Sequence, residues 1–198
     1  MIEQSVNKVA RRTNDPVATR AKILETSIRL FNEYGYHSVS FAQIAKATGF
    51  PKSLVAYHFG TKEELWGAVT AHMMKPAAEA MDLFLAGKLT VGELLTMRLQ
   101  MLAASPQRAR FVAWTSLSNI DIPLPLRERR DLMRKRIVDI DAETVRRCLM
   151  ALALMDGWFL NRSSYALLIG EEAVDSVTTE RLKIEIEKLI GLPLESEA

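Results

Sequence analysis

The sequence contains one cysteine in 198 residues, so an internal disulfide framework is excluded. Cys148 lies in a stretch rich in leucine and methionine, where a thiol is usually a small core side chain rather than a reactive group. Long hydrophobic runs are also missing, because the longest, Leu149–Met155, is far shorter than the ~20 residues that cross a bilayer. The N-terminus is polar and charged, unlike a signal peptide. We therefore expect a soluble cytoplasmic protein that does not associate with membranes.

Residues that carry catalysis or hold metals are also few. The three histidines, His37, His58 and His72, lack metal-ligand spacing, and the sequence has no glycine-rich phosphate loop and no nucleophile elbow. We therefore predict no catalytic residues, no metal site and no cofactor, and an enzyme is not favoured.

Charge is divided unevenly along the chain, although the net charge is only +2. Residues 1–60 contain eight lysines and arginines against four acidic residues, whereas the remaining 138 residues contain 18 basic and 20 acidic ones. A basic N-terminal part on an acidic body is typical of a DNA-binding domain attached to a different module. The alternative is a chance fluctuation of surface charge.

The stretch from Ser40 to Lys62 predicts two short helices joined by a tight turn. Ser40 can cap the first helix, and Gln43 in the N3 position completes a capping box. Gly49 tolerates the positive φ that a helix C-terminus often needs, and Pro51 suits the first turn of the next helix. This arrangement is a helix-turn-helix, whose second helix enters the DNA major groove.

The second of these helices, roughly residues 51–59, is predicted to bury Val55 and Phe59. Its outward side chains are then Lys52, Ser53, Leu54, Ala56 and Tyr57.

The flanking sequence predicts helices only. Asp15 and Pro16 open a helix that Gly35 ends, and Thr61 caps the helix that follows the motif. Breaks at glycine and proline divide the body into predicted helices at 62–75, 76–86, 90–103, 106–118, 126–139, 142–161, 162–170 and 178–190.

The segments IAKATGF (44–50), YHF (57–59) and TKEEL (61–65), after LFNEYGYHSVSF (30–41), resemble the DNA-binding domain of the tetracycline-repressor (TetR) family. The resemblance covers about the first third of the chain. It implies contacts to DNA from Ser40, Gln43, Lys52, Ser53, Leu54, Ala56, Tyr57, His58 and Lys62.

Individual roles follow from the resemblance and from side-chain chemistry. Lys62 is expected to bind a phosphate at the helix start, and Lys52 a guanine edge or a phosphate. Leu54 cannot hydrogen-bond, so its natural partner is a thymine methyl group. Ser53 and Ala56 depart from the glycine and tyrosine common in the family, so we expect fewer backbone anchors.

The body is expected to bind a small molecule and to form a homodimer, again by resemblance. The candidate pocket residues are bulky side chains on central helices: Met97, Met101, Phe111, Trp114, Leu117 and Trp158. The candidate dimer residues come from the most apolar helix and the last one: Leu149, Leu152, Met155, Phe159, Leu182 and Ile186. For both sets, packing within one subunit is the alternative.

Together these features predict an all-α protein with a flexible basic arm (1–15), a helix-turn-helix domain (16–66) and a helical ligand-binding and dimerisation domain (67–198). The expected function is a homodimeric repressor that binds palindromic double-stranded operator DNA and is released by a small-molecule effector. The alternative is a DNA-binding protein without such a ligand, controlled by a protein partner or organising DNA. A cavity of several hundred Å³ in the body would favour ligand control.

Overall fold

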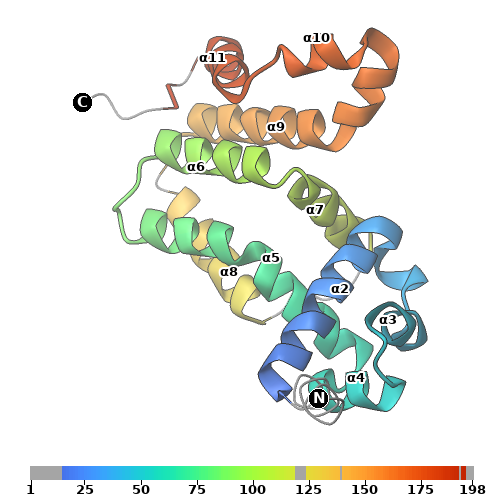
Figure 1. The fold of residues 1–198 in the computed structure, drawn as a ribbon. Helices are drawn as coiled ribbons and strands as arrows, with labels where there is room; N and C mark the ends of the chain where they lie inside the picture. The colour runs from blue at the N-terminus through green and yellow to red at the C-terminus, as the bar shows by residue number, and fades with distance from the viewer. Residues whose placement is uncertain (1–14, 119–123, 139, 192, 195–198) are drawn as a thin grey trace, which may run out of the picture. The chain divides into compact units, whose positions relative to one another are not determined.

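The computed structural model describes residues 15–118, 124–138, 140–191, 193 and 194, and every element in this part of the chain is a helix (Figure 1). The all-α prediction is therefore confirmed. The predicted basic arm, except Asp15, lies outside the described residues. The chain divides into two compact units, Met1–His72 and Met73–Ala198, which meet within helix α5 rather than at the predicted boundary between residues 66 and 67.

The first unit contains α2 (Pro16–Ser38), α3 (Phe41–Thr48), α4 (Lys52–Phe59) and the start of α5 (Lys62–Leu85). Its helix ends follow the predicted capping chemistry. The Asp15 carboxylate accepts hydrogen bonds from the amides of the first turn of α2, and Gly35 breaks the helical geometry before Ser38, with φ of 76°.

The core of this unit is an aromatic cluster between α2 and α5. The Phe31 and Trp66 rings meet edge to face with centroids 5.1 Å apart, and the Tyr36 ring lies 5.3 Å from Trp66. Tyr36 donates a hydrogen bond of 2.7 Å to the Glu63 carboxylate. Tyr34, two residues before Tyr36 in the same helix, is 48% exposed and lies outside this cluster.

The second unit contains the end of α5, α6 (Val91–Ala104), α7 (Gln107–Leu117), α8 (Leu124–Ile137), α9 (Ala142–Ile169), α10 (Glu171–Asp175) and α11 (Thr179–Ile190). The long helix α9 is its central element, because α6, α7, α10 and α11 all pack against it (Figure 1). Side chains from α6, α9 and α11 form its apolar core.

Two predicted breaks are wrong. Helix α5 continues through Pro76, where the Arg108 guanidinium donates to the Met73 carbonyl in the turn that the proline disturbs. Helix α9 continues through residues 161 and 162, where no glycine or proline interrupts it. The short α10 lies between Gly170 and residue 176 and was not predicted.

The chain after α11 returns to α6 at Gly92. A Cβ atom at Gly92 would lie 2.5 Å from the Pro193 carbonyl oxygen, so the two backbones are closer than any side chain allows. The Leu194 side chain is fully buried, its amide donates to the Glu187 carboxylate at 2.8 Å, and the Thr96 hydroxyl donates to its carbonyl. Leu194 therefore belongs to the core of the second unit, whereas Pro193 is exposed and contacts α6 through its backbone.

Substituting Gly92→Ala should separate α6 from residues 193 and 194 and lower the free energy of unfolding by about 1–3 kcal/mol, the usual cost of overpacking. The matched control is Gly67→Ala in α5, because a Cβ there meets nothing within 4 Å. This control should gain about 0.5–1 kcal/mol from helix propensity. Chemical denaturation measures both, and a neutral Gly92→Ala would contradict the close approach.

Burial, helped by the hydrogen bond to Glu63, raises the pKa of Tyr36 to about 12. An unfolded tyrosine titrates near pH ~10, so the folded state holds this proton more tightly. The resulting stabilisation is complete below pH ~10 and is lost as the pH rises from about 10 towards 12. In Tyr36→Phe, denaturation measured across alkaline pH should show a smaller loss of stability in that window. Tyr57→Phe, at an 81% exposed position, should behave as the wild type.

Candidate DNA-binding surface and body cavity

Helix α4 presents one side to solvent and buries the other. Val55 is completely buried and Phe59 is 6% exposed, as predicted. Lys52, Ser53 and Tyr57 are exposed. The remaining predicted contact residues of this helix, Leu54, Ala56 and His58, are half-buried. The outward side chains thus form one continuous face that a DNA groove could meet.

The turn before α4 has the predicted geometry. Ser40 and Gln43 form the complete capping box of α3, with the Ser40 amide donating to the Gln43 side-chain oxygen at 2.7 Å. Gly49 lies in the left-handed region with φ of 76°, and its amide closes the last turn of α3. Pro51 is the N-cap of α4 and offers no side-chain cap, so the helix start keeps its partial positive charge for an anion. Ser40 and Gln43 are exposed but already bonded to each other, so a DNA contact would add to this structural role.

Lys62 lies at the start of α5, and its side chain contacts two residues of α2. Its ammonium group lies 4.3 Å from the centre of the Tyr36 ring and donates to the His37 carbonyl at 3.4 Å. Desolvation lowers the pKa of Lys62, and the nearby Glu63 carboxylate partly opposes that shift. Thr61 and Glu64 form a second capping box at this helix start.

Two further cations lie on aromatic rings of the motif, which the sequence analysis did not anticipate. The Arg20 guanidinium lies 4.5 Å from the centre of the Phe59 ring, and the Lys22 ammonium lies 5.1 Å from that of Phe50. Both cations come from the first turns of α2. Aromatic residues within a basic motif are the signal that could have suggested these contacts.

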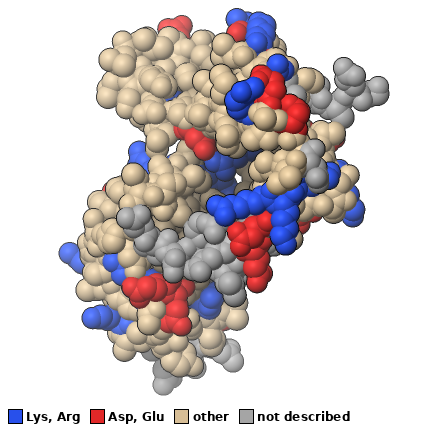
Figure 2. Space-filling model, turned by 180° about the vertical axis from the view of Figure 1, so that it is seen from behind, with Lys and Arg blue, Asp and Glu red and all other residues tan. Residues whose placement is uncertain are grey.

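Charge alone marks no DNA surface on the face shown in Figure 2, where basic and acidic side chains are interspersed among broad uncharged areas. Part of the basic excess of the N-terminal third comes from Lys8, Arg11 and Arg12, which lie outside the described residues. The candidate DNA-binding surface is identified here by the geometry of α4.

The second unit contains a cavity of about 400 Å³. Helices α5, α6, α8 and α9 form its wall, which is lined by Ala77, Ala80, Met81, Phe84, Val91, Leu94, Leu95, Arg98, Met101, Met133, Ile137, Ile140, Val145, Cys148, Leu149, Leu152 and Asp156. Only Arg98 and Asp156 are charged, and they form an ion pair of 2.5 Å. Burial raises the pKa of the Cys148 thiol, so the uncharged form is favoured.

Of the predicted pocket residues, only Met101 lines this cavity. Phe111 is completely buried, Leu117 is 75% exposed, and Trp158 lies in a shallow groove between α9 and α11. Met97 and Trp114 are half-buried outside the lining. The prediction chose bulky side chains of α6, α7 and α9, whereas the cavity is lined mainly by aliphatic residues, methionines and Phe84 from α5, α6, α8 and α9.

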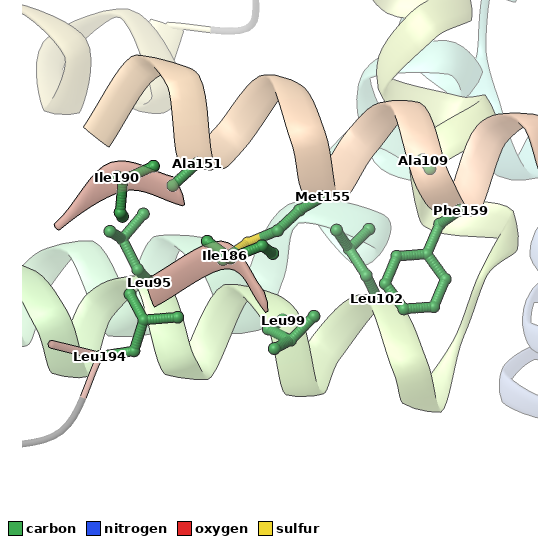
Figure 3. Close-up of a cluster of buried hydrophobic side chains, with 10 residues drawn as sticks. All are labelled: Leu95, Leu99, Leu102, Ala109, Ala151, Met155, Phe159, Ile186, Ile190 and Leu194. Carbon is green, nitrogen blue, oxygen red and sulfur yellow. The ribbon is translucent and has the colours of Figure 1, made fainter. Parts of the chain in front are cut away.

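The predicted dimer residues also divide. Met155, Phe159 and Ile186 point into the core of the second unit (Figure 3), and a buried side chain has no surface to offer a partner. Leu182 packs against that core, and Leu149 and Leu152 line the cavity. The structure therefore moves Met155, Phe159 and Ile186 from the interface to the core. The exposed apolar side chains beside them include Leu154 and Leu189.

The described residues hold no group of three or more histidine, cysteine or acidic side chains that could bind a metal. Within the same part of the chain, every helix is too short or too polar to cross a membrane.

Comparison with known proteins places the N-terminal unit in a sequence family. The model described as bacterial regulatory proteins, tetR family, matches residues 23–69. The HTH-type transcriptional repressor AcnR of Corynebacterium efficiens is 34% identical over 67 residues, 34% of this chain and 36% of that protein. The HTH-type transcriptional regulator RutR of Escherichia coli K12 is 24% identical over 121 residues, 60% of this chain and 57% of that protein. The matched part thus spans about a third of AcnR and just over half of RutR.

Two solved structures share the fold along most of the chain. A transcriptional regulator (TerR/AcrR family) from Aquifex aeolicus VF5 has a TM-score of 0.56 at 20% identity and covers 87% of this chain and 98% of its own. Salmonella enterica GusR has a TM-score of 0.57 at 18% identity and covers 91% of this chain and all of its own. The capped two-helix motif and the family match over residues 23–69 thus make the N-terminal unit similar to the tetR family of bacterial regulatory proteins, and the two solved structures share the all-α fold along most of the chain.

Proposed function

We propose that this protein is a DNA-binding transcriptional regulator that inserts α4 into the major groove. The observation that carries the proposal is the division of α4 into a buried side, with Val55 and Phe59, and an outward side, with Lys52, Ser53 and Tyr57. A helix anchored in this way keeps its outward side chains in a fixed register, which reading base edges requires.

The outward residues have separable roles in this proposal. Tyr57 and Lys62 bind phosphates, and the held position of Lys62 on the Tyr36 ring reduces the entropy lost when it does so. Leu54 contacts a thymine methyl group and thus supplies sequence preference without a hydrogen bond. Ala56 cannot provide a backbone anchor, so affinity depends more on the remaining phosphate contacts.

We also propose that the regulator is a repressor released by a small molecule bound in the body. The name repressor that AcnR carries supports the first part. The cavity of about 400 Å³ supports the second, since its volume and apolar lining lie in the range of small-molecule sites. Such a ligand acts only if it binds one arrangement of the body more tightly than the other.

A homodimer completes the proposal, because a palindromic site needs two reading helices one DNA turn apart, ~34 Å. The groove between α9 and α11 supports this surface as the interface, because Ala153, Gly157 and Leu182 line it together with the exposed Leu154 and Leu189. Small and aliphatic residues on two adjacent helices suit a four-helix contact between two copies.

DNA binding is tested with sites selected by footprinting the purified protein on the genomic DNA of its source. Lys62→Ala should weaken binding to selected and scrambled duplexes alike and reduce the slope of log affinity against log salt by about one. The matched control is Lys88→Ala, at an exposed position of the second unit, and it should leave the affinity and the salt slope unchanged. Leu54→Ala should weaken only the selected duplex, by about tenfold. Equal losses on both duplexes would refute its role in specificity, and no binding at any salt would refute the function.

The interface is tested with the pair Leu154→Arg and Leu189→Arg, at positions 39% and 67% exposed. Two buried like charges in each subunit should convert the dimer to a monomer in sedimentation velocity, and operator affinity should fall with it. Leu132→Arg on α8, 51% exposed, is the control and should sediment as the wild type. A variant pair that remains dimeric would place the interface elsewhere.

A further inference from the structure

We propose that the cavity binds an uncharged, largely apolar molecule that presents one hydrogen-bond acceptor oxygen, such as an ester or ketone carbonyl, to the Arg98 guanidinium. This inference rests on the proposed effector site and adds the chemical class of the ligand. Three properties of the cavity carry it: its apolar wall, its internally neutralised charge and an unsatisfied donor.

The wall selects an apolar body. Fifteen of the lining residues are uncharged, and most are alanine, leucine, isoleucine, valine, methionine or phenylalanine. Binding to such a wall removes apolar ligand surface from water, which is favourable. A ligand with several polar groups would find few hydrogen-bond partners there.

The ion pair selects a ligand without net charge. Arg98 Nη2 lies 2.5 Å from an Asp156 carboxylate oxygen, and the side chains are only 18% and 34% exposed. Each charge therefore already has its counter-ion inside the wall. An anionic ligand at Arg98 would lie beside the Asp156 carboxylate, and a cationic one at Asp156 beside the guanidinium, so either charge meets a like charge in apolar surroundings.

The unsatisfied donor selects an acceptor oxygen. A guanidinium carries five N–H donors. Among the described residues, the Arg98 guanidinium makes one hydrogen bond, from Nη2 to Asp156, and its Nε is fully buried, so the donors left for a ligand are the remaining N–H groups of the two Nη atoms. A pure hydrocarbon would leave this group short of acceptors, whereas a carbonyl oxygen at the guanidinium would supply one.

The test uses four probes of similar length: methyl octanoate, octanoate, octylammonium and nonane. Their affinities for the full-length protein are measured by displacement of a fluorescent apolar dye. Methyl octanoate should bind about tenfold more tightly than nonane, the effect of one additional hydrogen bond, and more tightly than both ions. An ion that binds tenfold more tightly than the ester, or an ester no better than nonane, would overturn the proposal.

Cys148 reports where the probe binds, because it lines the cavity and is the only cysteine of the chain. Methyl octanoate should slow alkylation of this thiol with the same concentration dependence as dye displacement. Displacement without protection of Cys148 would place the probe elsewhere and overturn the proposal.

Variants of Arg98 and Asp156 test whether the ion pair sets the preference for an uncharged ligand. Arg98→Met leaves the Asp156 carboxylate uncompensated and should shift the preference to octylammonium, whereas Asp156→Leu should shift it to octanoate. The double variant removes both charges, and nonane should then bind at least as tightly as the ester. An ester preference that persists in the double variant would contradict the role of Arg98. Should a variant fail to fold, the wild-type series and Cys148 protection still decide.

The DNA assay is kept separate, so that the two proposals fail independently. A protein that binds its DNA but no ester refutes only the ligand class. A protein that binds the ester at Cys148 but no DNA refutes only the proposed function.

Discussion

Helix α4, the proposed reading helix, has eight residues and is too short to be stable alone, so it depends on packing within the first unit. Helix α4 persists because Val55 and Phe59 are buried, because Gly49 sets the turn from α3, and because Gly60 ends the helix with φ of 67°. Its outward side can then be chosen for DNA rather than for packing. Residues that stabilise the helix and residues that would read DNA are thus different residues on the same two turns.

The second unit, by contrast, is not fully packed. Around α9, side chains from α6 and α11 fill one side to form a continuous apolar core, whereas the side towards α5 and α8 is left hollow. Interiors are normally close-packed, so a cavity of about 400 Å³ forgoes dispersion and apolar burial that filling it would provide. In the proposed function, a ligand would recover that free energy on binding, which would connect incomplete packing to control by a small molecule.

The motif could be predicted from the sequence nearly residue by residue. Three features of the motif follow from interactions between residues a few positions apart, which local rules describe well: the capping box, the left-handed glycine and the burial of Val55. Predictions about the body were weaker. Pro76 was expected to end a helix, yet α5 continues through it, and the Arg108 guanidinium from another helix donates to the Met73 carbonyl in the same turn.

The sequence by itself determined the all-α class, the helix ends of the first unit and the two sides of α4, since side-chain periodicity and capping act locally. Only the tertiary structure decided which face of α9 is core and which lines the cavity, because that helix is apolar around most of its circumference. It placed Met155 in the core, and it brought Arg98 to Asp156, 58 positions along the chain, at the wall of the cavity. Contacts between distant residues depend on how helices pack, and periodicity along one helix does not encode them.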